Sequence, residues 1–227
     1  MIKNILHLGD ASVYCDFGPE VNEQVNSRVL SYFIKIKELQ KQKIINGIIN
    51  LTPSYNKLII SFDLDKTNFN EVKEIVKNLE IDIQNKENNK KIEIPICCEE
   101  GLSLDFKRLN KLTNKSKSEI LDCFFNKEYF CYMTGFVAGM PFLGDVDKEI
   151  RCERLETPRV KVPRGSVGLT EQFANIYTSE SPGGWNIIGN TPVDIFNKSN
   201  EDSPNLINPG DKIKFYLITK EQYDNWK

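Results

Sequence analysis

The chain of 227 residues is long enough for one large domain or two small ones with a buried core. Its hydrophobic fraction of 40% and charged fraction of 27% are typical of a folded, water-soluble protein and exclude a disordered chain. Thirty basic and 32 acidic residues give a net charge of −2, so we expect no nucleic-acid partner, because phosphate backbones attract basic surfaces.

Residues 1–83 predict a small α/β domain with the element order ββαββα. Gly9-Asp10 separates two extended runs and is typical of a hairpin turn. Pro19 suits the first position of a helix, and Asn68, with Glu71 three residues later, suits the cap of another. We expect both helices to cover one face of an antiparallel sheet. The expected elements are strands at 2–8 and 11–17, a helix at 20–42, strands at 45–51 and 57–62, and a helix after Asn68.

Residues 84–91 contain no apolar side chain and predict a linker, so that a second domain spans residues 92–227. An alternating strand opens this domain, and a capping box at Ser116 and Glu119 begins the second of two short helices. Short apolar runs then alternate with Gly and Pro, which predicts a sandwich or a closed barrel. The runs are 129–133, 159–162, 166–170, 175–177, 185–188, 193–196 and 213–218, and a last helical turn follows Thr219.

Three glycines and a proline lie among large apolar side chains in residues 135–144. Such a backbone can approach a bound molecule closely while the side chains form an apolar wall. We therefore regard Phe136, Gly139, Pro141 and Phe142 as candidate substrate-binding residues. The alternative is a buried barrel corner.

A second Gly-rich turn lies in the segment 180–185. Pro182 followed by Gly183 suits a type II turn, and the N–H groups of the two glycines would hold an anion or a carbonyl oxygen. A purely structural turn is the alternative. The candidate substrate-binding residues of this segment are Glu180, Ser181, Gly183, Gly184 and Trp185.

Three cations lie close together in one predicted strand and the turn that follows it. In a strand, Arg159 and Lys161 share one face, whereas Val160 and Val162 share the other. We assign Arg159, Lys161 and Arg164 as candidate catalytic residues that clamp a carboxylate or a phosphate. The alternative is a solvated strand face.

Several kinds of site are disfavoured by missing residues. His7 is the only histidine, which argues against most zinc sites and most hydrolases with a catalytic histidine. Six cysteines form neither a disulfide framework nor a CxxC pair, so we expect reduced thiols and no metal site. Neither common nucleotide-binding fingerprint is present, so any ATP cradle takes another form or belongs to another chain. No apolar run approaches about 20 residues, and we expect a cytoplasmic chain without a membrane span.

Together the clusters resemble the KipI / allophanate hydrolase subunit 1 family. The family pattern reads approximately GFxPGFPYLGxLD, TPRxxVPxGSVGI, IYPxxSPGGWxxIGRTPxxxF and PGDxVxF. Four ordered motifs are far more specific than any one of them, and the resemblance covers nearly the whole chain. The matching stretches are 135–147, 157–169, 176–196 and 209–215, preceded by Gly9-Asp10-Ala11 and Phe17-Gly18, which resemble the family's opening.

The resemblance implies an α+β fold: a small N-terminal α/β domain followed by a cyclophilin-like β-barrel. It also implies the B subunit (PxpB-like) of an ATP-dependent 5-oxoprolinase complex, which converts 5-oxoproline, ATP and water to L-glutamate, ADP and phosphate. The expected partners are a C-type paralogous subunit (PxpC/KipA-like) and an A subunit (PxpA-like). ATP is expected at the level of the complex, whether or not this chain touches it.

That chemistry suggests roles for the candidate residues. A lactam carbonyl is a weak electrophile until its oxygen is phosphorylated, so the site must stabilise charge on a transferring phosphoryl group. Arg159, Lys161 and Arg164 would supply positive charge, and the amides of Gly183 and Gly184 would act as oxyanion donors.

The chain departs from the family pattern at several positions, which bear on catalytic competence and not on the fold. Ala138 stands where the family has Pro, Met140 where it has Phe, and Asn190 where it has Arg. Residues 170–175, which include Phe173 and Asn175, replace a Gly- and Gln-rich turn of the family. Cys123 or Phe124 stands where the family has a helix-end His.

Two other functions fit the same resemblance. One is a KipI-like regulator that inhibits a sensor histidine kinase, for which the apolar loop 136–142 would hold a protein segment. The other is a carboxyltransferase component of the urea-carboxylase type, which requires a biotinyl partner. An amide substrate requires Arg159 to converge with the Gly183–Gly184 turn, whereas a protein-binding face requires exposed aromatic residues without buried cations.

Overall fold

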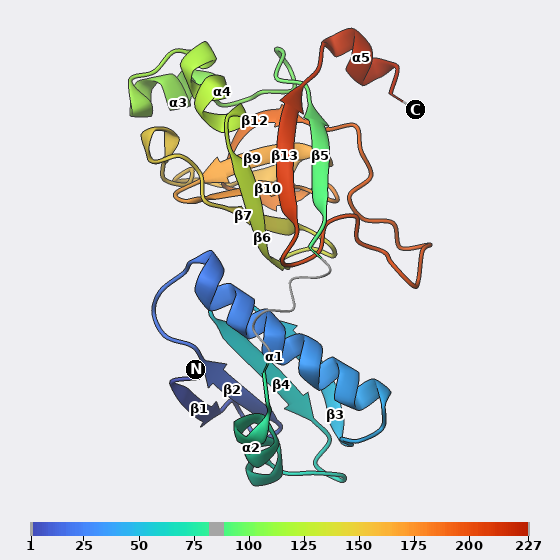
Figure 1. The fold of residues 1–227 in the computed structure, drawn as a ribbon. Coiled ribbons are helices and arrows are strands. Elements are labelled where there is room, and N and C mark those ends of the chain that lie inside the picture. Colours follow the sequence, from blue (N-terminus) through green and yellow to red (C-terminus); the bar gives the residue numbers. More distant parts are fainter. Residues whose placement is uncertain (1, 82–88, 227) are drawn as a thin grey trace. The chain divides into compact units, whose positions relative to one another are not determined.

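The computed structural model describes residues 2–81 and 89–226 (Figure 1). Contacts within the chain divide it into two units, residues 1–88 and 89–227. The expected linker at 84–91 lies outside the described residues as far as residue 88, so its bounds stay a prediction. None of the helices described is long and apolar enough to cross a membrane.

The N-terminal unit consists of β1 (Asn4–His7), β2 (Ser12–Asp16), α1 (Glu23–Lys41), β3 (Ile48–Pro53), β4 (Lys57–Phe62) and α2 (Phe69–Asn78). Its strands form one antiparallel sheet in the order β1-β2-β4-β3. The hairpin of β1 and β2 turns at Gly9, whose φ of 60° is the left-handed conformation that glycine adopts without strain. The predicted order ββαββα is confirmed.

One face of this sheet is buried beneath both helices. Alternate strand residues such as Val13, Leu58 and Ile60 are fully buried and share one core with Val29 of α1 and Val72 of α2. Val25, Val29 and Ile36 of α1 lie four and seven positions apart, and Val72 and Val76 of α2 lie four apart, which places each set on a single stripe. The expectation that the two helices cover the same face is confirmed.

Each helix of the N-terminal unit begins directly after a capping asparagine. The Asn68 side chain accepts a hydrogen bond from the N–H of Glu71, as the sequence predicts. The predicted start of α1 after Pro19 was wrong. Asn22 caps this helix, because its Oδ1 accepts the free N–H of Val25 at 2.9 Å, a bond that a proline side chain cannot make.

The C-terminal unit is built mainly from strands. Its elements are β5 (Lys91–Ile96), α3 (Phe106–Thr113), α4 (Lys117–Phe125), β6 (Glu128–Thr134), β7 (Pro141–Gly144), η1 (Lys148–Ile150), β8 (Arg159–Val162), β9 (Ser166–Thr170), β10 (Phe173–Ile176), β11 (Ser181–Gly183), β12 (Asn186–Asn190), β13 (Lys212–Leu217) and α5 (Lys220–Asp224).

Seven of these strands form one sheet in the order β12-β9-β10-β7-β6-β13-β5, while β11 pairs with β8 in a separate ribbon. Neighbours are antiparallel except β13 and β5, which run parallel side by side (Figure 1). The sheet curls until its edges meet. The N–H of Cys97, just after β5, donates to the carbonyl of Asn190 in β12 at 2.9 Å, and the reverse bond measures 3.0 Å. The predicted mixed architecture with a barrel-like sheet is confirmed.

Aromatic side chains fill the interior of the curled sheet beside α4. The rings of Phe124, Tyr129 and Phe215 pack with centroids 5.0 to 5.6 Å apart. α4 begins with the predicted capping box of Ser116 and Glu119. Phe124, one of the two residues at which the family pattern places a helix-end histidine, is a fully buried core residue.

Two expectations for individual strands were wrong. Residues 193–196 form no strand but a single bridge at Phe196, because Pro192 at the start of the segment has no N–H for a ladder. Conversely, residues 141–144 and 181–183, which the sequence assigns to Gly-rich loops, are the strands β7 and β11. Pairing with β6 and β8 holds their backbones extended although proline and glycine weaken the strand pattern.

Candidate functional site

The three segments singled out in the sequence meet in the C-terminal unit. Pro141 is buried at the start of β7, and next to it Phe142 packs edge-on against Trp185, with ring centroids 5.6 Å apart. These rings adjoin a small apolar cluster that is separate from the main core. Its members are Met140, Val162, Tyr177 and Ile187, with Val137 and Phe142 packed against them.

The loop before β7 is anchored by its neighbours. The hydroxyl of Thr178 donates to the carbonyl of Ala138 at 2.7 Å. Gly139 has a φ of 70°, and a Cβ there would lie 2.5 Å from the ring of Phe196, so only glycine fits. Phe136 also has a positive φ, and its side chain is 69% exposed. The loop therefore combines a packed base with one projecting aromatic residue.

The ribbon of β8 and β11 sets Arg159 opposite Gly183. A Cβ on Gly183 would collide with the Tyr177 hydroxyl, so packing requires glycine at this position. Ser181, on the same face of β11, has a buried Oγ with no hydrogen-bond partner in the described part of the chain. The predicted type II turn at Pro182-Gly183 was wrong, because residues 181–183 are extended in β11 and Gly183 lacks a positive φ; we keep the name Gly183–Gly184 turn for this segment, which is closely packed on its inner side.

Arg159 is held by a carboxylate that the sequence analysis did not identify. Its Nη2 lies 2.5 Å from Oδ1 of Asp105, and its Nη1 lies 3.5 Å from the carbonyl oxygen of Trp185. Asp105 precedes α3 but makes no side-chain cap there; its other carboxylate oxygen accepts the N–H of Ile187 at 2.6 Å. An aspartate before a helix is typical of an N-cap, which hides this role in the sequence.

The other two candidate cations pair with different carboxylates. Lys161 lies 3.0 Å from Glu180 at the exposed surface of the ribbon, and Arg164 pairs with Asp194. The structure therefore does not gather the three cations around one point. Val160 and Val162, predicted to share the other face of this strand, differ in burial: the side chain of Val160 is 81% exposed, whereas Val162 is fully buried.

Tyr177 is a buried residue of this region that the sequence analysis did not single out for function. Burial raises the pKa of its phenol, while hydrogen bonds from Asn175 and the Trp185 N–H, and the charges of Arg154 and Arg159, act in the lowering direction. Tyr177 belongs to the apolar cluster, and its hydroxyl is within electrostatic reach of both arginines. Asn175, one of the departures from the family pattern, therefore supports Tyr177.

A further arginine braces the same region. Arg108 on α3 donates from Nε to Oδ1 of Asn186 at 3.0 Å and from Nη2 to the carbonyl of Arg154 at 3.2 Å. The amide of Asn186 in turn donates to the carbonyls of Glu153 and Leu169. These bonds fix the backbone of residues 153 and 154 beside β12. No motif in the sequence marks them, because the partners are far apart along the chain.

Asn190, which stands where the family pattern has arginine, has a structural role. Its Nδ2 donates to the carbonyl of Arg164 at 2.9 Å, and its Oδ1 accepts the hydroxyl of Tyr223 in α5 at 2.8 Å. Together with the backbone bridge to Cys97, these bonds tie three segments together where the barrel closes. Phe173, another departure, packs edge-on against Tyr132, with centroids 5.9 Å apart.

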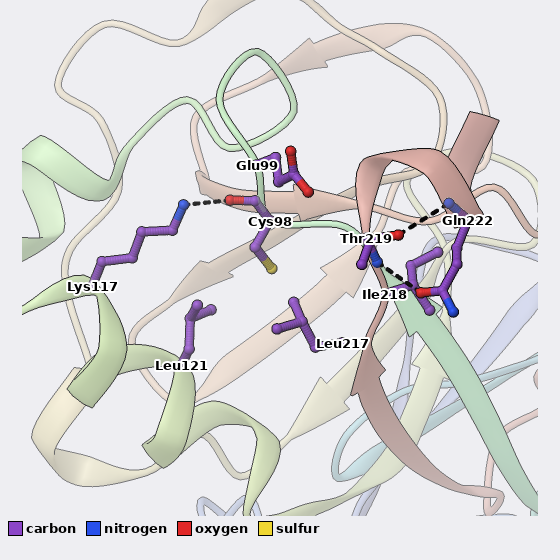
Figure 2. Close-up of a pocket in the computed structure, with 8 residues that line it drawn as sticks. All are labelled: Cys98, Glu99, Lys117, Leu121, Leu217, Ile218, Thr219 and Gln222. Atoms are coloured by element: carbon purple, nitrogen blue, oxygen red, sulfur yellow. Dashed lines mark hydrogen bonds between the residues drawn. The ribbon is translucent and has the colours of Figure 1, made fainter.

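A separate cavity of about 260 Å³ opens between α4 and the end of β13 (Figure 2). Lys117 donates to the carbonyl of Cys98 at 2.5 Å, and Thr219 and Gln222 bond reciprocally at the start of α5. The polar groups at the rim of this cavity are thus largely hydrogen-bonded within the chain. None of the candidate site residues from the sequence lines it. The lining residues are Cys98, Glu99, Lys117, Leu121, Leu217, Ile218, Thr219 and Gln222.

Several cysteines are buried, which disfavours the thiolate form of their side chains. Burial raises the pKa of Cys15 and of Cys98 to about 12 and that of Cys152 to about 11, so each of these thiols stays protonated. All six cysteines are free. Residues 2–81 and 89–226 contain no group of three or more His, Cys, Asp or Glu arranged to hold a metal ion.

Comparison with known proteins gives a family match over most of the chain. Residues 3–207 match the family described as carboxyltransferase domain, subdomain C and D. The chain is 33% identical to the B subunit of the 5-oxoprolinase of Bacillus subtilis, over 98% of this chain and 96% of that protein. The corresponding 5-oxoprolinase B subunit of Haemophilus influenzae is 29% identical over 94% of this chain and 97% of its own length.

Solved structures show the same fold. The protein TTHA0988 matches with a TM-score of 0.80 and 26% identity over 92% of this chain, which spans only 40% of TTHA0988. An uncharacterised protein of Pyrococcus horikoshii, PH0987, matches over 97% of this chain and 100% of its own, with 32% identity and a TM-score of 0.57. The Kluyveromyces lactis urea carboxylase, at 18% identity and a TM-score of 0.78, contains the fold within a chain of which this one covers 22%.

Proposed function

Because the chain belongs to the family of carboxyltransferase domains, subdomain C and D, we propose that it acts as the B subunit of an ATP-dependent 5-oxoprolinase complex. The complex converts 5-oxoproline, ATP and water to L-glutamate, ADP and phosphate. Support comes from the 5-oxoprolinase B subunits of Bacillus subtilis and Haemophilus influenzae, which align with this chain over nearly their whole length.

The reaction sets definite demands on a site. The lactam oxygen attacks the γ-phosphorus and ADP leaves; one water then adds to the activated carbon and the C–N bond opens to leave γ-glutamyl phosphate, from which a second water releases phosphate. A site for this sequence must bind a small ring with a carboxylate and must stabilise negative charge on oxygen. An apolar wall beside fixed hydrogen-bond donors and cations meets these demands.

One observation carries the assignment of the site: Arg159 and the Gly183–Gly184 turn converge. Arg159 is opposite Gly183 in the ribbon, and its guanidinium reaches the carbonyl of Trp185. The aromatic pair of Phe142 and Trp185 adjoins the same turn. The convergence is the feature expected of an amide-binding site and not of a docking face built from exposed aromatic residues.

Within this proposal the candidate residues have distinct tasks. Arg159, held by Asp105, stabilises charge on the reacting oxygen, and the turn amides act as further donors. In the apolar loop, Phe136 and Phe142 provide the wall for the ring of the substrate, and Gly139 and Pro141 belong to its packed base. Lys161 and Arg164, which pair with Glu180 and Asp194, contribute positive charge at a greater distance.

Partners complete the proposed enzyme. We assign ATP as a substrate of the complex and expect its main cradle on another subunit, since this chain has neither common nucleotide-binding fingerprint. The proposed partners are a C-type paralogous subunit and an A-type subunit. The two 5-oxoprolinase relatives are themselves subunits, which implies such companions, and this chain spans only 40% of TTHA0988, in which the same fold belongs to a longer chain.

Reconstitution tests this function. The chain is co-expressed with a C-type partner, purified, mixed with an A subunit and assayed for phosphate release that depends on 5-oxoproline. We expect ATP hydrolysis only with all three proteins present, and a rate about 10- to 100-fold lower with Arg159→Ala, since oxyanion-stabilising groups contribute at least that much. No turnover by the intact assembly would refute the function, whereas undiminished turnover with Arg159→Ala would refute only the role of Arg159.

A further inference from the structure

We infer that Arg154, a residue outside every sequence motif, binds the carboxylate of the lactam substrate at the face of Gly184. The inference rests on the proposed function and deepens it, because it names the group that selects a carboxylate-bearing lactam. In this arrangement Arg159 serves the reacting oxygen, and Arg154 serves the opposite end of the substrate.

The backbone of Arg154 is pinned beside the turn. The N–H of Leu155 donates to the carbonyl of Gly184 at 2.7 Å, and Arg108 donates to the carbonyl of Arg154 at 3.2 Å. Neighbouring Glu153 is held through Asn186. An arginine on a fixed backbone loses less freedom when it binds a ligand than one on a mobile loop.

The guanidinium of Arg154 lies directly over Gly184. A Cβ built on Gly184 would stand 3.6 Å from both Nε and Nη2 of Arg154 and 3.5 Å from Cγ of Pro158, so the guanidinium lies against the face of Gly184 beside Pro158. The charges of Arg154 and Arg159 both act on the Tyr177 hydroxyl, which packs under the neighbouring Gly183. The two guanidinium groups therefore flank the same turn.

Arg108, Arg154 and Arg159 differ in the carboxylates that lie near them. Arg159 is paired through Nη2 with Asp105 at 2.5 Å, and the closest carboxylate oxygen to Arg108 is on Glu153, at 3.8 Å. Arg154 is exposed and has no carboxylate partner in the described ranges 2–81 and 89–226. A planar guanidinium presents two parallel N–H groups that match the two oxygens of a carboxylate. The whole guanidinium fork of Arg154 is thus available to an incoming carboxylate.

The test uses Arg154→Gln in the reconstituted three-protein complex. We expect the KM for 5-oxoproline to rise about 10- to 100-fold while kcat and the KM for ATP stay within about twofold, because a group that binds substrate and transition state equally affects KM alone. Lys107→Gln, which removes an exposed charge from the neighbouring helix, is the matched control and should leave all three constants unchanged. Arg154→Lys should fall between the wild type and Arg154→Gln, since an ammonium keeps the charge but loses the fork.

Each outcome has a defined meaning. A raised KM for ATP with an unchanged KM for 5-oxoproline would assign Arg154 to a phosphoryl group and overturn the inference, as would unchanged constants. A lower kcat with unaltered KM would also overturn it, because it would indicate a role in the chemical step. Inactivity of the wild-type assembly would refute the proposed function itself. Equal melting temperatures of wild type and variants establish that folding is not the cause.

Discussion

The carboxylate of Asp105 binds the guanidinium of Arg159 at 2.5 Å with one oxygen and the backbone N–H of Ile187 at 2.6 Å with the other. The N–H of Asp105 also donates to the carbonyl of Ile187 at 3.1 Å. One residue before α3 therefore joins β12 to the ribbon of β8 and β11. The position of Arg159 depends on a residue 54 positions earlier in the chain.

Asp105→Asn should destabilise the C-terminal unit. The substitution leaves Arg159, whose side chain is 27% exposed, without its counter-charge, and an orphaned partly buried cation costs about 2 to 3 kcal/mol of unfolding free energy. Urea denaturation measures the change. Glu180→Gln, which breaks the exposed pair with Lys161, is the control and should cost about 0 to 1 kcal/mol. Equal losses in the two variants would contradict a special role for Asp105.

Two neighbouring glycines should respond differently to alanine. Gly183→Ala places a methyl group against the Tyr177 hydroxyl and should lower the unfolding free energy by about 1 to 3 kcal/mol, as overpacking does. Gly184→Ala puts its methyl at ordinary contact distance from Pro158 and Arg154, so its stability should stay within about 0.5 kcal/mol of wild type. Thermal unfolding of the pair distinguishes them, and a destabilised Gly184→Ala with a stable Gly183→Ala would reverse the proposed packing.

Removing the hydroxyl of Tyr223 should loosen the last helix. In Tyr223→Phe, Oδ1 of Asn190 loses its side-chain donor, and the net contribution of one such hydrogen bond is about 0.5 to 1.5 kcal/mol. Amide hydrogen exchange should become faster in α5, while the N-terminal unit serves as the internal reference. Unchanged exchange throughout α5 would show that the helix is held by other contacts.

The protein should lose stability at alkaline pH. The pKa of the Cys98 thiol is raised from 9.0 to about 12 by burial, so between these values the unfolded thiol ionises while the folded one stays protonated. The unfolded state then binds fewer protons, and the unfolding free energy falls by about 1.4 kcal/mol per pH unit for each such group. This loss begins as pH rises through about 9 and ends near 12.

Cys98→Ala isolates that contribution. Between pH 9.5 and 11 the variant's unfolding free energy should fall less steeply than that of the wild type by about 1.4 kcal/mol per pH unit, whatever the cost of the substitution at pH 7. Denaturant titrations at several pH values provide the slopes. Parallel slopes would mean that the thiol ionises equally readily in the folded and unfolded states.

Local patterns in the sequence were sufficient for most elements. Period-two and three-to-four-residue spacings predicted the strands and helices of the N-terminal unit, and the capping boxes at Ser116 and Thr219 begin helices in the structure. These signals are local, because a cap or an amphipathic stripe depends on residues within a few positions of one another. The strands at 141–144 and 181–183 were missed because pairing with distant strands overrides their glycine and proline content.

The sequence by itself determined the two-part architecture, the barrel-like second half and the Gly-rich composition of residues 135–144 and 180–185. Only the tertiary structure decided which polar groups act there. It paired Arg159 with Asp105, separated Lys161 and Arg164 onto other carboxylates, and gave Arg154 none among the residues that the structure describes. The physical reason is that an ion pair joins residues brought together by chain closure over tens of positions, and spacing along the chain carries no record of that contact.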